Sequence, residues 1–322
     1  MFSVVIPLYN KAHTIINTLE SVLNQTFPDF EVVIVNDGST DNAIEVIKNN
    51  FSDSRIRIIN QENKGVSAAR NLGVRESRNE LIAFLDGDDE LLPEYLSKMK
   101  EAIEKFPDAG MYCCAGIVRE SNGSEHLRYA KKYKDVIQEI NYFENPFFFT
   151  NSSSTIIKKS EFNKTEGFPL NMKINEDLVF FCSLALITPV IYCPFPLSVY
   201  LKGVEGQASG GNKKIYEFVI SRTNQVFHNW LKTNQKNKLF LTFTKYEMRN
   251  EVIIYLRNND YEALDYLIKN LDARLLKYFS AFEFFIYKNK SLKLAAMSYI
   301  YFTKSIWKLS GFPIVQFKKI NK

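Results

Sequence analysis

Short apolar runs alternate with amphipathic segments over the N-terminal part of the chain. The runs predict strands at Ser3–Pro7, Glu31–Val35, Ile56–Ile59 and Leu81–Leu85. Apolar positions with helical spacing predict helices at 15–23, after the turn at 37–40, and at 65–77. Strands and helices that alternate in this way build a mostly parallel sheet with helices on both faces. The pattern therefore predicts an α/β fold with a Rossmann-like sheet.

The pattern becomes less regular after Met111 and turns helical beyond the Gly-rich stretch 209–211. Strands are expected at Met111–Val118, Ser153–Lys158 and Val190–Tyr200, and a helix at Glu176–Leu186. We place a boundary near residue 212. This gives a first domain at 1–211 and a helical C-terminal region at 212–322.

Residues Leu178–Leu201 carry no charge and are numerous enough to span a bilayer. Pro189, Pro194 and Pro196 interrupt the segment, which favours a buried helix followed by a strand over one continuous helix. The N-terminus shows no signal-peptide pattern, so we expect a cytoplasmic protein.

The positive charge of the chain is concentrated near its C-terminus. The 322 residues are 46% hydrophobic and 24% charged, as in ordinary globular proteins. After Glu283 the chain has eight lysines and no acidic residue. This segment contributes a charge of +8, so the net charge of +5 for the whole chain leaves −3 for the residues before it. A local anionic partner is therefore expected at the tail rather than nucleic acid along the chain. The four cysteines and three histidines lack metal-site spacing, which argues against a zinc or histidine centre.

Acidic residues follow a predicted buried strand at Asp86-Gly87-Asp88-Asp89. Ligands of parallel sheets bind beyond the carboxyl ends of the strands. Carboxylates there suit a hard divalent cation that leaves positions open for phosphates. The alternative is a solvated acidic turn before the next helix.

Acidic residues in two further segments have both a functional and a local explanation. Asp37, at the end of a strand, either hydrogen-bonds a nucleotide or stabilises the Asp-Gly-Ser turn. Glu176 and Asp177 begin an apolar helix and point in directions about 100° apart. One of them is suited to act as a general base, although acidic residues also stabilise helix N-termini.

Five segments together resemble the inverting family-2 glycosyltransferases with the GT-A fold. They occur in the family's order and spacing: SVVIPLYNKAHTI, VIVNDGSTD, NKGVSAARNLG, FLDGDD and NEDLVFF. The resemblance covers residues 1 to about 210. It implies a nucleotide-binding part at about 1–110 and an acceptor part at about 111–211.

The resemblance also implies the roles of the donor-site residues. Pro7 and Tyr9 would line the base pocket, with Tyr9 stacked on the base. Asp37 would hydrogen-bond the base, which is usually uracil. Lys64 and Arg70 would lie in the segment that closes the nucleotide site.

The catalytic roles follow by the same resemblance. Asp86 would face the ribose and the metal, and Asp88 would be the principal ligand of Mn²⁺ or Mg²⁺. Asp177 would be the catalytic base, and Glu176 would help to place the acceptor. The segment near 200–209 often supplies a cation to the diphosphate, and Lys202 is the one cation it holds here.

The expected activity is transfer of one sugar from a UDP-sugar or related donor to a hydroxyl of a glycan or lipid-linked glycan, with inversion. The chain lacks the QxxRW motif of the family's processive polymerases, which favours single transfer. It also lacks the GxGxxG and GxxxxGK[ST] loops of dehydrogenases and P-loop enzymes. A nucleotidyltransferase and a non-catalytic sugar-nucleotide-binding module remain as alternatives.

The tail from 284 to 322 allows two interpretations. On a helix over 290–309, four lysines (290, 293, 304 and 308) share one side. The opposite side carries Leu292, Ala295, Tyr299, Phe302, Ile306 and Leu309, with Ile300 and Trp307 toward one margin. Such a helix either lies on an anionic membrane surface or packs its apolar face on the catalytic domain with its lysines in solvent. Since many bacterial relatives act on lipid-linked glycans, we expect peripheral contact with the membrane.

Overall fold

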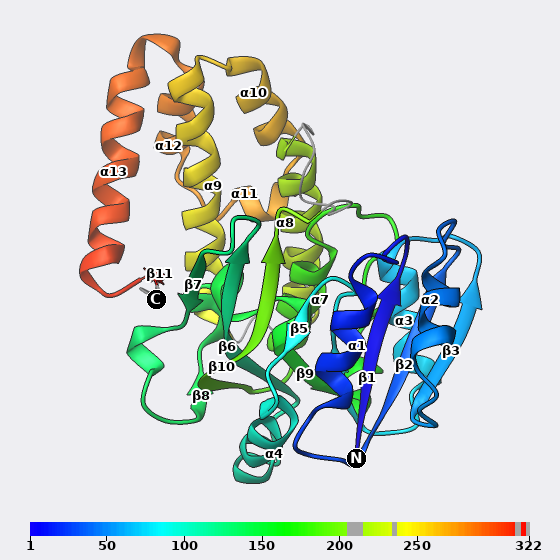
Figure 1. Cartoon of the computed structure of the whole chain (residues 1–322). Coiled ribbons are helices and arrows are strands. Elements are labelled where there is room, and N and C mark those ends of the chain that lie inside the picture. The colour runs from blue at the N-terminus through cyan, green and yellow to red at the C-terminus, as the bar shows by residue number, and fades with distance from the viewer. Residues whose placement is uncertain (205–214, 234–236, 313–316, 320–322) are drawn as a thin grey trace. The chain divides into compact units, whose positions relative to one another are not determined.

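The computed structural model describes residues 1–204, 215–233, 237–312 and 317–319 (Figure 1). The chain divides into two compact units. Unit 1 comprises Met1–Tyr142, Pro146–Gly211 and Val315–Lys322, and unit 2 comprises Phe143–Asn145 and Asn212–Ile314. The change of unit at 211–212, like the Gly-rich stretch 209–211, falls outside the described residues.

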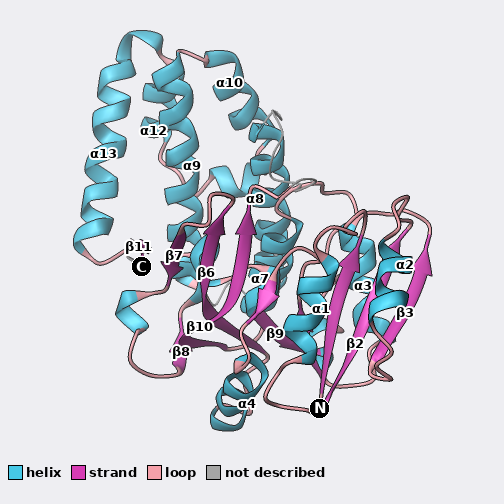
Figure 2. Cartoon of the chain, viewed as in Figure 1, coloured by secondary structure: helices cyan, strands magenta, loops and turns pink. Residues whose placement is uncertain are grey.

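In unit 1, eleven strands of the described residues join one mixed sheet (Figure 2). Its strands follow the order β11-β7-β6-β9-β4-β1-β2-β3, and β10 pairs with β5, β6 and β8. The strands are β1 (Phe2–Leu8), β2 (Phe30–Asp37), β3 (Ile56–Gln61), β4 (Leu81–Phe84), β5 (Glu90–Leu91), β6 (Met111–Glu120), β7 (Glu125–Arg128), β8 (Gln138–Ile140), β9 (Thr155–Lys158), β10 (Val190–Lys202) and β11 (Phe317–Lys319).

The first four strands are parallel, as the sequence predicts. Val4 of β1 lies beside Val32 of β2 and Ala83 of β4. Every residue of β1 is buried, which explains its unbroken apolar run, because helices cover both faces of such a sheet. The second half of the sheet is different, since β9 runs antiparallel to both β4 and β6.

Seven α-helices of the described residues accompany this sheet in unit 1. They are α1 (Ile15–Leu23), α2 (Ala43–Asn50), α3 (Val66–Glu76), α4 (Tyr95–Lys105), α5 (Pro146–Phe149), α6 (Lys159–Phe162) and α7 (Glu176–Ala185). Helix α3 packs directly on β1 and β2. Gly73 makes this approach possible, because a Cβ atom at that position would lie 2.3 Å from Cγ1 of Val5.

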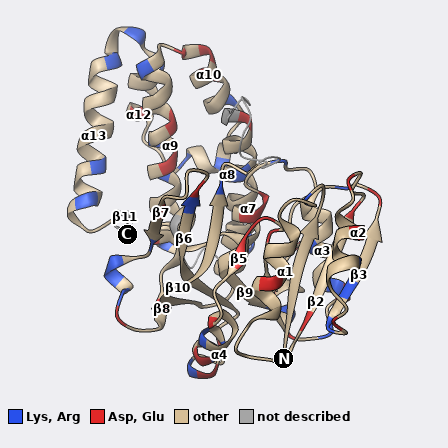
Figure 3. Cartoon of the chain, in the orientation of Figure 1, with Lys and Arg blue, Asp and Glu red and all other residues tan. Residues whose placement is uncertain are grey.

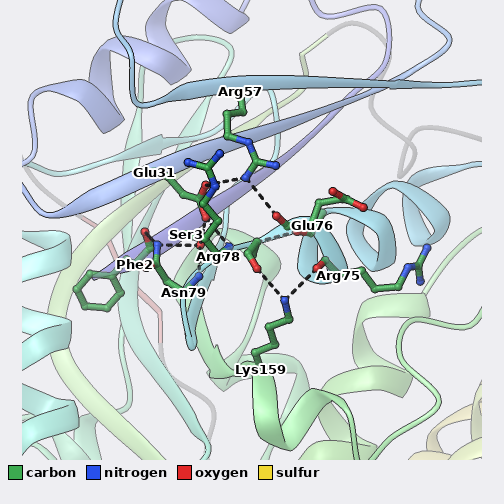
Figure 4. Close-up of polar contacts among 11 residues, drawn as sticks. Phe2, Ser3, Glu31, Arg57, Arg75, Glu76, Arg78, Asn79 and Lys159 are labelled. Carbon is green, nitrogen blue, oxygen red and sulfur yellow. Dashed lines mark hydrogen bonds and ion pairs between the residues drawn. The ribbon is translucent and has the colours of Figure 1, made fainter.

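The amino ends of the parallel strands are held together by Glu31 at the start of β2 (Figure 4). Its carboxylate accepts hydrogen bonds from Ser3 Oγ at 2.7 Å, from the Arg78 N–H at 2.6 Å and from Arg57 Nη1 at 2.8 Å. Burial alone would raise the pKa of Glu31, but the hydrogen bonds that it accepts hold it below the ordinary value. This end of the sheet is therefore a closed polar network, while the carboxyl ends remain available for a site.

The apolar segment Leu178–Leu201 is divided between α7 and β10, as its prolines predict. The pairing of β10 with β6 shifts register between Cys193 and Ser198, where Pro194 and Pro196 lie. Throughout the described ranges, no helix has both the length and the apolar character needed to cross a membrane.

Unit 2 is helical over nearly all of its described residues. Its α-helices are α8 (Ile215–Lys232), α9 (Lys238–Asn258), α10 (Tyr261–Asn270), α11 (Ala273–Leu276), α12 (Ala281–Lys288) and α13 (Lys293–Leu309). Arg249 of α9 and Glu283 of α12 form a buried ion pair at 2.7 Å inside this unit. Ser280 caps α12 by accepting a hydrogen bond from the Glu283 N–H.

Helix α13 packs on its neighbours in unit 2 mainly through the margin between its lysine side and its apolar side. Ala296 and Ile300 are fully buried, and Lys304 Nζ donates a hydrogen bond to Asn250 of α9. Phe302 and Leu309 remain 65% and 89% exposed. These two side chains therefore lie outside the packed core of unit 2. The expectation of helix to the chain end is wrong, because β11 pairs with β7 of unit 1.

Candidate active site

A cleft of about 560 Å³ opens at the carboxyl ends of the parallel strands, within unit 1. The end of β1, the start of α3, the turn between β4 and β5, and the start of α7 all contribute to its wall. Eight of the ten residues that the sequence suggests for the site line this cleft: Pro7, Tyr9, Asp37, Arg70, Asp86, Asp88, Glu176 and Asp177.

The rim beside Tyr9 is fixed by asparagine side chains. Asn10 adopts a left-handed conformation with φ of 52°, and its Oδ1 accepts a hydrogen bond from the Thr40 N–H at 2.8 Å. Asn36 Oδ1 accepts a hydrogen bond from the Ser39 N–H at 3.0 Å. The first bond joins the turns after β1 and β2, and the second closes the turn after β2. The Tyr9 side chain stays 46% exposed at the cleft.

Asp37 holds the loop that leads into α3. Its Oδ1 accepts hydrogen bonds from Gln61 Nε2 at 2.6 Å and from the Lys64 N–H at 2.8 Å. Its Oδ2 accepts a hydrogen bond from the Gly65 N–H at 2.9 Å. Gly65 has φ of 86°, a conformation that glycine adopts without strain. The carboxylate thus has a structural role in addition to any contact with a ligand.

In the acidic turn after β4, Asp88 faces a lysine. Lys11 Nζ lies 2.6 Å from Asp88 Oδ2, and the two side chains are only 12% and 10% exposed. Lys11 follows the end of β1, which places it on the same rim as Tyr9.

Asp89 points into the protein. It accepts hydrogen bonds from Ser153 Oγ and from the Leu201 N–H at 3.1 Å, which attach the turn to β10. Burial, followed by the negative charge of Asp86, raises the pKa of Asp89 well above its ordinary value. The three aspartates of the turn therefore occupy three different environments.

Arg70 of α3 joins two of the acidic groups. Its Nη2 lies 2.6 Å from Asp86 Oδ1, and its Nη1 lies 3.0 Å from Glu176 Oε1. The guanidinium also lies over the ring of Phe168, 5.4 Å from its centroid. Burial alone would lower the pKa of Arg70, but the charges of the surrounding carboxylates raise it above the ordinary value. The sequence did not predict that Arg70 bridges these groups, because the bridge connects segments that are far apart in the chain.

Asp177 begins α7 next to Glu176. Its Oδ1 accepts a hydrogen bond from the Leu178 N–H at 2.7 Å, and the side chain lines the cleft. Burial, and then the charge of Glu176, raise its pKa from 3.8 to about 6 against the opposing effect of Arg70. A carboxylate with such a pKa is suited to accept a proton near neutral pH.

Two of the suggested residues do not line the cleft. Lys64 contributes its backbone N–H to Asp37, while its side chain is exposed. Lys202 is 57% exposed and forms an ion pair with Glu120 at 3.1 Å. The cleft instead includes Lys11 and Arg128, which are not among the residues that the sequence suggests. The position of Lys11 directly after the PLYN segment was a usable signal, whereas no motif marks Arg128 on β7.

Comparisons with known proteins agree on one family. Residues 3–166, just over half of the chain, match the family described as glycosyl transferase family 2. An uncharacterized glycosyltransferase of Rickettsia bellii is 49% identical over 87 residues, which cover 27% of this chain and 13% of that protein. The uncharacterized glycosyltransferase YibD of Escherichia coli is 40% identical over 104 residues, covering 32% and 30%. Glycosyltransferase GlyA of Streptococcus pneumoniae is 35% identical over 151 residues, covering 44% and 21%. The matches therefore span less than a third of each relative's length.

Solved structures show the same fold along most of the chain. The crystal structure of S. aureus TarS 1–349 in complex with UDP-GlcNAc matches with a TM-score of 0.69 at 18% identity, over 97% of this chain and 92% of that chain. The complex of the same protein with UDP matches with a TM-score of 0.65 at 19% identity, over 96% and 91%. The fold is thus the GT-A fold that the sequence predicts. By its fold and its match over residues 3–166, the chain belongs to glycosyl transferase family 2.

Proposed function

We propose that this glycosyltransferase moves one sugar from a UDP-sugar to a hydroxyl of a glycan or lipid-linked glycan, with inversion at the anomeric carbon. One observation carries the proposal: Asp177, whose pKa is raised to about 6, lines the same cleft as the acidic turn and the Tyr9 rim. The catalytic base, the acidic turn that would face the diphosphate and the aromatic ring that would bind the nucleobase then share one cavity. A uridine donor is supported by the similar fold of TarS, which has been solved with UDP-GlcNAc and with UDP.

The donor's base is assigned to the β1 and β2 end of the cleft. The exposed ring of Tyr9 offers a face on which a base stacks, and Pro7 lines the wall beside it. Asp37 lines the same end and is already held in place by the loop at 61–65. Arg70 holds Asp86 in the cleft wall. The proposal gives Lys64 and Lys202 secondary roles at most, since their side chains lie outside the cleft.

Asp86 and Asp88 fit a divalent cation by the chemistry of their oxygen donors. No three His, Cys, Asp or Glu side chains converge on a metal position in the described part of the chain. Mg²⁺ characteristically takes one or two carboxylates together with substrate phosphates, and the cleft offers two. Bound Mn²⁺ or Mg²⁺ would neutralise charge on the departing diphosphate.

The reaction that suits this arrangement is a direct displacement. Asp177 accepts the proton of the acceptor hydroxyl as its oxygen forms a bond to the anomeric carbon. The bond from that carbon to the diphosphate oxygen breaks, and its electron pair leaves with the nucleoside diphosphate. The incoming oxygen attacks opposite the leaving group, so the anomeric configuration inverts. Glu176, held by Arg70, is assigned to placing the acceptor.

Calorimetry with UDP, GDP and ADP in the presence of Mn²⁺ tests the donor site. The proposal expects UDP to bind most tightly and Tyr9→Ala to weaken that binding. Equal affinity for the three nucleotides in both proteins would contradict the assignment of the base.

We further propose that α13 contacts an anionic membrane surface. Its outward side carries Leu294, Phe302, Ile306 and Leu309, which are between 50% and 89% exposed. Lys290 and Lys308 are exposed near the two ends, and the helix has no acidic residue (Figure 3). An apolar side flanked by cations suits a helix in the interface of anionic lipids.

Co-sedimentation with vesicles tests this contact. The full chain should bind phosphatidylglycerol–phosphatidylcholine vesicles, bind pure phosphatidylcholine less, and dissociate as salt rises. The double variant Phe302→Ser with Leu309→Ser should lose binding, while Leu170→Ser, at an apolar position of unit 1 that is about as exposed as Phe302, should retain it. Equal binding by all three proteins, or by none, would contradict the proposal. Point variants are preferred to deletion of 284–322, because that segment includes Ile286 and Ile300 of the unit 2 core.

A further inference from the structure

The cleft holds an internal cation at the position where the proposed function requires a metal. Lys11 Nζ lies 2.6 Å from Asp88 Oδ2, and both side chains are nearly buried. Water and salt therefore screen this pair only weakly. An ammonium group and a divalent cation on the same carboxylate would repel one another strongly at such low exposure. Lys11 and the cation are thus competitors for Asp88.

The other ion pair of the acidic turn is built differently. Arg70, which binds Asp86, also binds Glu176 and lies over the Phe168 ring, so several contacts fix its planar guanidinium. Lysine carries its charge on a flexible stem of four carbons. Of these two cations, Lys11 is the one suited to change partners.

The backbone beneath Lys11 is firmly attached to the acidic turn. The Thr14 N–H donates to the Lys11 carbonyl at 3.1 Å, and Thr14 Oγ1 donates to the Gly87 carbonyl at 2.8 Å. A Cβ atom at position 87 would lie 3.5 Å from Lys11 Cγ, so glycine leaves space beside the lysine stem. Only the side chain needs to move, and it moves within a cleft of about 560 Å³.

We propose that Lys11 is an exchangeable counter-ion. It neutralises Asp88 in the metal-free cleft, and it transfers to the donor diphosphate when a divalent cation takes its place on Asp88. The inference rests on the proposed function for the site and adds a mechanism for how its two ligands depend on one another. Metal alone must displace Lys11 from Asp88 without supplying a negative charge in exchange, and nucleotide alone must attract it away from Asp88. Together, each ligand removes the obstacle to the other, which is positive coupling between two binding events.

Calorimetry on the full chain measures this coupling directly. Mn²⁺ is titrated with and without saturating UDP, and UDP is titrated with and without saturating Mn²⁺. In the wild-type protein we expect each ligand to strengthen the other by about tenfold or more. Lys11→Met, which keeps the length of the stem and removes the charge, should bind Mn²⁺ alone about tenfold more tightly. Its coupling factor should fall to about a third or less of the wild-type value.

Three controls separate exchange from other effects. Lys100→Met removes a lysine that is paired with Glu104 on α4, and it should leave every affinity unchanged. Uridine, which lacks phosphates, should bind wild type and Lys11→Met equally. Lys11→Arg keeps the charge and should keep Mn²⁺ binding weak, which covers the case in which Lys11→Met folds poorly.

The outcomes are distinct. Undiminished coupling in Lys11→Met, or unchanged Mn²⁺ affinity in that variant, overturns the exchange mechanism while leaving the proposed donor site intact. A wild-type protein that binds neither UDP nor Mn²⁺ in any combination contradicts the proposed function itself and the inference with it.

Discussion

Replacing Asp177 with asparagine removes a carboxylate whose charged form the folded protein disfavours. The group has a pKa of about 6 in the folded protein against an ordinary value of 3.8. Between these values the unfolded chain binds fewer protons than the folded protein, so stability falls as the pH rises through this window. The full penalty is present above about pH 6 and is absent below the ordinary pKa.

The size of the effect follows from the two pKa values. Their difference corresponds to about 3 kcal/mol at about 1.36 kcal/mol for each pH unit. Part of the rise comes from the charge of Glu176, whose own environment also changes in the variant. We therefore expect Asp177→Asn to be more stable than wild type by about 2 kcal/mol at pH 8, with a smaller difference as the pH falls below 6.

Urea unfolding followed by two probes provides the assay. Far-UV circular dichroism reports both units, whereas both tryptophans, Trp230 and Trp307, lie in unit 2. If the units unfold separately, the stabilisation should appear in the circular dichroism and leave the tryptophan fluorescence transition in place. If they unfold together, both probes should shift equally. A variant that is no more stable than wild type at pH 8, or whose advantage does not change with pH, would show that the folded protein does not disfavour the charged Asp177.

Four other outcomes follow from the structure. Asp88→Ala should lower turnover about 100-fold or more, and full activity in excess EDTA would exclude metal dependence. Tyr9→Ala should weaken free UDP and intact donor alike by about 1–3 kcal/mol in calorimetry, and an unchanged affinity would mean that the base binds elsewhere. The pH profile of kcat/KM should fall about tenfold per pH unit below about pH 6, as Asp177 becomes protonated; a flat profile down to pH 5 would rule it out as the base. Gly73→Ala should destabilise unit 1 by about 1–3 kcal/mol in urea unfolding, because its Cβ would collide with Val5. Wild-type stability in this variant would show that α3 can shift away from β1 at no cost.

The parallel half of the sheet was predictable because its signals are local. Strands buried on both faces read as unbroken apolar runs, and β1 to β4 lie close to the expected residues. The carboxyl ends of these strands then had to meet on one rim, which brings Tyr9, Asp37 and the acidic turn together.

The region between β6 and β9 was not predictable in the same way. Short elements such as β7 and β8 depend on pairing with distant strands, and their own sequences carry little apolar periodicity. The ion pairs of the site could not be predicted from the sequence for a related reason. Contact between Arg70 and Glu176 spans 106 positions, and contact between Lys11 and Asp88 spans 77. No local pattern reports such separations.

The orientation of α13 shows a further limit. The helical wheel placed Phe302 and Leu309 opposite the lysines, and the structure agrees with that division. The wheel could not decide which side meets the rest of unit 2. Packing through small Ala296 and through Ile300 decides it, and leaves the large apolar side chains outside.

Sugar transfer by wild type and Asp177→Asn shows whether Asp177 is the base of an inverting displacement. Transfer from a panel of UDP-sugars to oligosaccharide acceptors with Mn²⁺ is followed by NMR, which reports both the release of UDP and the anomeric configuration of the new glycosidic bond, and UDP affinity is measured in parallel. We predict turnover by the wild type with inversion, and a loss of about 100-fold or more in the variant at unchanged UDP affinity. Equal turnover by the two proteins, or a product with retained configuration, would mean that Asp177 is not the base of an inverting displacement.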